Sequence, residues 1–340
     1  MNHTGLTRRT ALAALTSAVA TITTGCGGGG SDGDVATPPP PPPTAPLEPG
    51  PVTSVPPAVY ADVNRKLAFD RLNWARASAG LGLFRQSAEL DQAAQAHSRY
   101  MSLTGITGHD ETPGNAGFTG ATVTDRAVSV GYLPDRVSEV GAAVKSPAGG
   151  IELIDSLLGT PYHRMGMLLF HPIDAGYGVA EDQFNYRFLT GMQGGRNGEQ
   201  QSALEKFIVW PVDNAVDIPY SMWPERPDPI PENLGNSPGY AASIHSNEKF
   251  RSIEVDLFEM RTSAGNLVDA KLLSTATDDV LRTTYPIIGK GFVALLPRAP
   301  LMPNSTYSVV FRGKVVSNHT GRAESVSKDW RFSTGSGEFF

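Results

Sequence analysis

Residues 90–101 read Leu-Asp-Gln-Ala-Ala-Gln-Ala-His-Ser-Arg-Tyr-Met, and this stretch decides the fold of the region around it. Leu90, Ala94, His97 and Met101 recur at the spacing that puts side chains on one face of a helix. Gly105 follows as a helix stop. The spacing therefore predicts an amphipathic helix, with His97 as a hydrogen-bonded residue on its buried face.

The flanking sequence predicts further helices alternating with short strands. A helix is expected to end at Gly80, and shorter helices are expected at residues 127–131 and 151–158. Strands are expected at residues 137–144, 176–180 and 186–192. Helices that alternate with short strands indicate an α/β layered domain.

A series of short motifs lies in order along this region. The motifs are Leu72-Asn73-x-x-Arg76-x-x-x-Gly80-Leu81, Leu90-x-x-Ala93-Ala94-x-x-His97-Ser98-x-x-Met101, Gly108-His109, Arg126-x-x-x-x-Gly131-Tyr132, Thr160-Pro161-Tyr162-His163-Arg164 and Gly176-x-Gly178-Val179-Ala180. Together, over residues 60–195, they resemble the CAP domains of cysteine-rich secretory, antigen 5 and pathogenesis-related proteins, also called SCP domains. The resemblance implies an α-β-α sandwich.

The same resemblance implies a cleft in which two histidines and one or two acids converge. Matched motif by motif, His109, Glu139 and His163 correspond to that set. Asp155 lies nearest the position of the second acid, where the family carries glutamate. The resemblance therefore predicts a site made of these four residues.

Two chemical interpretations of the predicted site stay open. His109, His163 and Glu139 are a donor set that can hold a divalent, zinc-like cation with one open position. Alternatively, Glu139 orients one of the histidines as a general base. No nucleophile with an adjacent base is evident in the sequence.

The resemblance to CAP domains implies a binding or signalling module, in some members for lipids or sterols, rather than an established enzyme. The preferred interpretation is therefore a cell-envelope or extracellular binding module whose ligand is a lipid, peptide or glycan. One alternative is a hydrolase of peptides or cell-wall material that uses the same cleft. A further alternative is a structural adhesion or spacer protein whose contact surface lies in its C-terminal region.

Beyond residue 198 the helical period gives way to strand patterns. Ile253, Val255 and Leu257 alternate with acidic residues, as in a half-buried strand. About seven short strands separated by turn residues indicate a β-sandwich. Two motifs, Leu301-x-Pro303-x-x-x-Tyr307-x-Val309 and Trp330-x-Phe332-x-Thr334-Gly335, resemble bacterial Ig-like domains. We therefore expect a CAP domain at residues 58–198 and an Ig-like β-sandwich at residues 199–340.

The first 57 residues predict export and anchoring. Residues 1–26 combine an arginine pair, a short apolar run and small residues before Cys26, as in a lipoprotein signal peptide. Cys26 is the predicted lipidation site, which makes a membrane a partner and the bacterial cell envelope the expected location. Residues 27–57 are rich in glycine and proline and predict a disordered stalk.

Composition excludes several other classes of protein. The chain has 340 residues and a formal net charge of −6, whereas a nucleic-acid binder needs a basic face. It has one cysteine, which excludes a disulfide framework and any cysteine-rich metal site.

Overall fold

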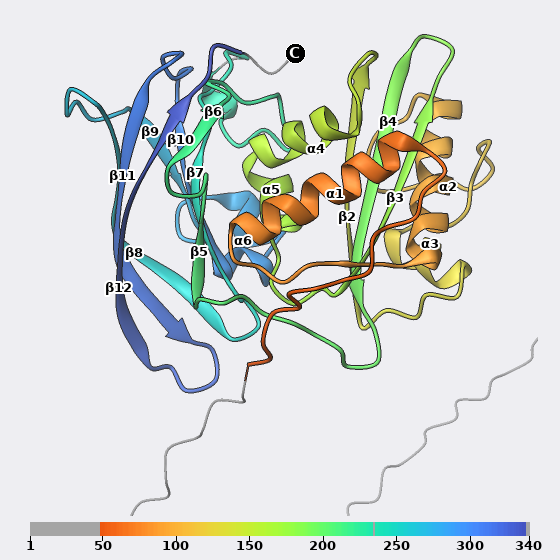
Figure 1. The fold of residues 1–340 in the computed structure, drawn as a ribbon, viewed down its shortest axis with the longest axis horizontal. Coiled ribbons are helices and arrows are strands. Elements are labelled where there is room, and N and C mark those ends of the chain that lie inside the picture. The colour runs from red at the N-terminus through yellow and green to blue at the C-terminus, as the bar shows by residue number, and fades with distance from the viewer. Residues whose placement is uncertain (1–47, 234, 338–340) are drawn as a thin grey trace, which may run out of the picture. The chain divides into compact units, whose positions relative to one another are not determined.

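Helix α2 (Ala88–Thr104) forms where the spacing of residues 90–101 predicts it, in a computed structural model that describes residues 48–233 and 235–337 (Figure 1). The Ser87 side chain caps its start by accepting a hydrogen bond from the backbone N–H of Leu90. Gly105 ends the helix in the left-handed conformation, at φ 69°. Leu90, Ala94 and His97 are buried, which confirms the predicted inward face.

Helix α2 lies on a four-stranded sheet in which the strand order is β1-β3-β4-β2. The strands are β1 (Arg85–Gln86), β2 (Arg136–Lys145), β3 (Asp174–Glu181) and β4 (Tyr186–Gly195). A Cβ atom at Gly176 or Gly178 of β3 would come within 2.2 Å of backbone atoms of α2. Glycine at these positions therefore lets the helix approach the sheet backbone closely.

Helices cover both faces of this sheet, as expected for an α-β-α arrangement. Helix α3 (Val123–Ser129) lies beside α2, whereas α1 (Val63–Ser78) and α4 (Gly150–Gly159) lie on the other side (Figure 1). Helix α5 (Pro161–Met167) follows α4, begins at a proline and was not predicted.

The C-terminal region is rich in β-structure, as predicted, and contains two four-stranded sheets. The strand orders are β5-β7-β10-β9 and β6-β12-β11-β8. The bounds are β5 (Phe207–Trp210), β6 (Ala215–Ile218), β7 (Ala242–Ser246), β8 (Arg251–Thr262), β9 (Ala270–Leu273), β10 (Phe292–Pro297), β11 (Thr306–Ser317) and β12 (Ala323–Thr334), with helix α6 (Asp279–Thr283) between β9 and β10. The finer assignment to an Ig-like sandwich stays a prediction.

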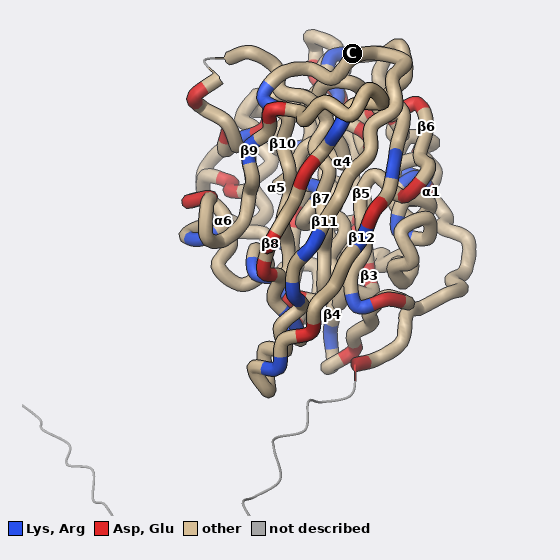
Figure 2. The backbone as a smooth tube through the Cα atoms, turned by 90° about the vertical axis from the view of Figure 1, so that its left-hand side faces the viewer, with Lys and Arg blue, Asp and Glu red and all other residues tan. Residues whose placement is uncertain are grey.

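The second of these sheets carries charges of both signs on its exposed face. Figure 2 shows basic and acidic residues interspersed along β8, β11 and β12. Arg312 pairs with Asp329 across β11 and β12, and Lys314 lies 3.9 Å from Glu254 of β8. The opposite face is buried and carries Phe258, Phe311 and Trp330. The alternation of charged and apolar residues is the pattern that predicted these strands.

One hydrophobic cluster joins the α/β region to the C-terminal sheets. It includes Leu72 of α1, Leu157 of α4, Trp210 of β5 and Trp330 of β12. The described residues accordingly belong to one compact unit. The predicted boundary at residues 198 and 199 stays a prediction.

The predicted signal peptide, the lipidation site Cys26 and most of the predicted stalk lie outside the described residues. Within residues 48–233 and 235–337, no helix has the length and apolar character needed to cross a bilayer.

Candidate functional site

A cavity of about 540 Å³ lies at one end of β2 and is lined by both predicted site histidines. His109 comes from the loop after α2, and His163 comes from α5. The lining also includes Ser156 and Leu157 of α4, and Trp223 and Arg226 of the C-terminal region. The cavity is therefore built from the α/β region and from the segment that follows it.

His109 is held by the buried carboxylate of Glu139 on β2. Its Nδ1 atom lies 3.0 Å from Glu139 Oε1, and the side chains of His109 and Glu139 are 47% and 1% exposed. The hydrogen bond to Glu139 raises the pKa of His109 above its ordinary value, against the opposing effect of burial. Burial alone would raise the pKa of Glu139, but the hydrogen bond from His109 and the charges of His97 and Arg126 outweigh it, so that this pKa is lowered.

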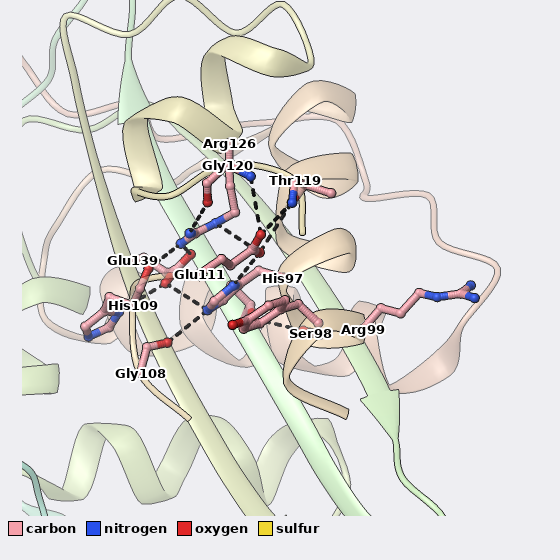
Figure 3. Close-up of polar contacts among 12 residues, drawn as sticks. His97, Ser98, Arg99, Gly108, His109, Glu111, Thr119, Gly120, Arg126 and Glu139 are labelled. Carbon is pink, nitrogen blue, oxygen red and sulfur yellow. Dashed lines mark hydrogen bonds and ion pairs between the residues drawn. The ribbon is translucent and has the colours of Figure 1, made fainter. Parts of the chain in front are cut away.

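Arg126 supports this pair from inside the protein. Its buried guanidinium donates hydrogen bonds to Glu139 Oε2 at 2.7 Å and to the backbone oxygen of His109 at 2.8 Å (Figure 3). One arginine thus fixes both the carboxylate and the loop that carries the imidazole. Arginine suits this role because its planar donors reach several acceptors at once.

His97 lies in the same buried cluster and confirms the prediction of a hydrogen-bonded core histidine. Its Nδ1 atom lies 2.9 Å from Glu111 Oε1, and its Nε2 atom lies 2.9 Å from the backbone oxygen of Gly108 (Figure 3). Glu111 also accepts a hydrogen bond from the backbone N–H of Thr119. Both ring nitrogens of His97 therefore face oxygen atoms inside the protein.

The buried cluster pairs acidic with basic side chains. Glu111 and Glu139 lie beside Arg126 and His97, and all four side chains are at most 1% exposed. Buried charges are tolerated when they are paired in this way. His109 lies at the edge of the cluster, where its imidazole reaches the cavity.

His163 is held by a different acid, Glu225, which sequence analysis did not identify. Its Nδ1 atom lies 2.6 Å from Glu225 Oε1, and the Glu225 side chain is fully buried. The backbone N–H groups of Tyr162 and His163 also donate to this carboxylate, at 3.1 and 2.7 Å. Thr160, the N-cap residue of α5, makes no capping bond with its side chain, so that Glu225 takes over this function.

The structure does not bring Asp155 to this cavity. The Asp155 carboxylate accepts two hydrogen bonds from Arg71 of α1, at 2.6 and 3.0 Å. Both residues line a separate cavity of about 720 Å³, beside Trp74. Of the four predicted site residues, His109 and His163 therefore line the shared cavity, Glu139 lies directly behind His109, and Asp155 lies elsewhere.

The residues at the cavity fit the predicted zinc-like cation in part. In the part of the chain that the structure describes, no group of three or more His, Cys, Asp and Glu side chains is placed to hold a metal ion. The oxygens of Glu139 are occupied by His109 and Arg126. The cavity thus offers a cation two imidazole Nε2 atoms, half of the four ligands that zinc prefers, and the metal site stays a hypothesis.

The residues that sequence analysis missed differ in how they could have been found. Glu111 lies two residues after His109, so that an acid next to the functional loop was visible in the sequence. Glu225 lies 62 residues after its partner, between prolines, and no periodicity marks it as buried.

Comparison with known proteins agrees with the motif analysis. The model of the CAP family, described as the cysteine-rich secretory protein family, matches residues 69–169. Among curated proteins, no sequence matches the chain.

Two solved structures resemble part of the chain. An extracellular protein containing an SCP domain, from Bacillus anthracis str. Ames, is 24% identical with a TM-score of 0.34, and the match covers 39% of this chain and 40% of that one. An outer surface protein from Borrelia burgdorferi is 13% identical with a TM-score of 0.35, and the match covers 41% of this chain and 97% of that one. The chain thus spans less than half the length of the first of these proteins.

Proposed function

Because residues 69–169 form a CAP domain, we propose that the protein is a binding module of the cell envelope or extracellular space, and that its ligand site is the cavity lined by His109 and His163. One observation carries the proposal: both imidazoles that line this cavity have their Nδ1 atom held by a buried carboxylate. This arrangement fixes the orientation of each ring and leaves its Nε2 atom available to contact a ligand.

Binding is favoured over hydrolysis by the hydroxyl groups of the cavity. Ser156 donates its hydroxyl hydrogen to the backbone oxygen of Leu153, and Thr160 donates to that of Leu157. Thr160 Oγ1 also lies 3.1 Å from His163 Nδ1, but that nitrogen lies 2.6 Å from Glu225 Oε1 and is engaged by the carboxylate, so that neither hydroxyl faces an available base. The hydrolase alternative instead requires His109, oriented by Glu139, to take a proton from water as a general base.

The N-terminal residues support the same location. We propose that Cys26 carries a lipid and that the proline-rich segment after it spaces the folded region from a bacterial membrane. Retention of a Cys26→Ser chain in the washed membrane fraction would contradict this anchor.

A cavity-blocking substitution tests the binding proposal. Thr107 lines the cavity and is exposed, whereas the neighbouring Ile106 is exposed but does not line it. Thr107→Trp should therefore fill the cavity without disturbing the core, and Ile106→Trp is the matched control.

The measurement is calorimetric titration with soluble peptidoglycan fragments, a mixture of synthetic peptides and phospholipid vesicles. We expect the wild type and Ile106→Trp to bind one of these ligands alike, and Thr107→Trp to bind at least about tenfold more weakly. Equal binding by all three chains would place the site outside the cavity. Chromatographic detection of new products from the same mixtures would favour the hydrolase.

A further inference from the structure

The segment Trp223-Pro224-Glu225-Arg226 contributes to the cavity in two ways. Glu225 points into the protein, where its carboxylate binds His163 and the start of α5. Trp223, Pro224 and Arg226 line the cavity itself. A segment outside the part of the chain that matches the CAP family thus forms one wall of the CAP cavity.

The charged and titratable side chains of the cavity are basic. They are His109, His163 and Arg226, and no Asp or Glu belongs to the described lining. The nearest carboxylates, Glu139 and Glu225, are 1% and 0% exposed and are engaged by their partners. The carboxylates thus lie behind the imidazoles, and the basic side chains line the cavity.

Apolar side chains also line the cavity, which is larger than a small ion requires. They include Met101, Ala142, Val144, Leu157 and Trp223. A cavity of about 540 Å³ falls in the range that holds a drug-sized molecule, most of whose surface is buried against apolar side chains. A ligand that fills it needs an apolar or aromatic body in addition to a polar group.

We propose that this cavity binds an anionic ligand, namely a carboxylate or phosphate group on an apolar or aromatic body, and that Arg226 and the two histidines hold the anionic group. The planar guanidinium of arginine matches two oxygens of a carboxylate or phosphate at once. The inference rests on the proposed function, because it names the ligand class of the same cavity.

The test uses phenyl phosphate and benzoate as anionic probes and benzyl alcohol as a neutral probe of similar shape. Inorganic phosphate serves as an anion that lacks an apolar group. Calorimetric titrations are made on the full chain, on Arg226→Ala and Arg226→Lys, and on Arg322→Ala, an exposed arginine that does not line the cavity. Arg226 is exposed, so that its replacement should leave the thermal melt unchanged.

We expect phenyl phosphate or benzoate to bind the wild type more tightly than benzyl alcohol and inorganic phosphate do. Arg226→Ala should weaken this binding by about tenfold or more, Arg226→Lys by less, and Arg322→Ala should bind as the wild type does. Preference for phenyl phosphate or for benzoate identifies which anion the site takes.

Three outcomes would overturn the inference: equal affinity for the anionic and neutral probes, unchanged binding by Arg226→Ala, or binding of zinc alone with no affinity for either anion. Failure of the proposed function is distinguishable, because it would appear as ligand binding that Thr107→Trp does not weaken. If Thr107→Trp still abolishes binding of a cell-envelope ligand while the anionic probes do not bind, the cavity remains the site and only its ligand class is wrong.

Discussion

The two imidazole–carboxylate pairs at this cavity have the same chemistry but different support. His109 and Glu139 are 30 residues apart, and both lie inside the segment that matches the CAP family. His163 and Glu225 are 62 residues apart, and the acid comes from the region beyond that segment. The first carboxylate belongs to a buried cluster of acidic and basic side chains, whereas the second caps a helix. The first pair thus lies within one matched segment, and the second depends on a long-range contact.

Removing the cation behind the first pair should have the largest effect. Arg126→Met removes the guanidinium that lies beside the buried carboxylates of Glu111 and Glu139. We expect a loss of about 3–5 kcal/mol in the free energy of unfolding, measured with urea. Adding Glu139→Gln should recover part of this loss, because the uncompensated charge is then gone. A loss as small as that of Arg282→Ala on the surface would show that the charges are not coupled.

Removing the acid of the second pair should have a smaller effect that is local to α5. Glu225→Ala deprives the backbone N–H groups of Tyr162 and His163, and the His163 ring, of their acceptor. We expect a loss of about 2–3 kcal/mol and faster hydrogen exchange at the Tyr162 and His163 amides than at those of α2. Glu225→Gln, which keeps one acceptor oxygen, should lie between the wild type and Glu225→Ala. Unchanged exchange in Glu225→Ala would mean that the acid does not support the helix.

The smallest effect is expected from the pH dependence of the His109–Glu139 pair. Since the folded protein raises the pKa of His109, the stabilisation by the imidazolium is complete below about pH 6.5 and is lost as the pH rises through the raised value. The difference in unfolding free energy between wild type and His109→Ala should therefore shrink from pH 6 to pH 9. Its size should stay below about 1 kcal/mol, because the His109 side chain is 47% exposed. The same comparison in a Glu139→Gln background should show little change with pH, and an undiminished slope there would assign the effect to another group.

Most of the fold could be predicted because its elements show clear periods. Helix α2 carries the helical pattern over 17 residues. Strand β8 shows the alternating pattern at residues 253–256, after which a register shift leaves Leu257 exposed and buries Phe258. Helix α5 has seven residues and is too short to show a helical period. Strand β6 has four residues and pairs in parallel with β12, which lies more than a hundred residues away in the sequence. Such pairing is set by tertiary contacts, which no local pattern reports.

The candidate site was predictable to the extent that it lies in short motifs. His109, Glu139 and His163 could be named because each lies in or beside such a motif. Asp155 was the nearest acid in the sequence, but successive helix residues point about 100° apart, and on α4 it is Ser156 and Leu157 that line the histidine cavity while Asp155 faces Arg71. Glu225 could not be predicted, because its position depends on how the two regions pack.

The position of Glu225 makes ligand binding and the junction between the two regions thermodynamically linked. A ligand that needs His163 in its observed orientation also favours the contact that holds α5 to residues 223–226. The linkage is reciprocal. The factor by which the ligand favours the intact junction equals the factor by which loss of the junction lowers the affinity for the ligand. A fragment of residues 58–198 would keep every motif of the CAP resemblance and yet present a different cavity, with His163 released from its acid and one wall missing.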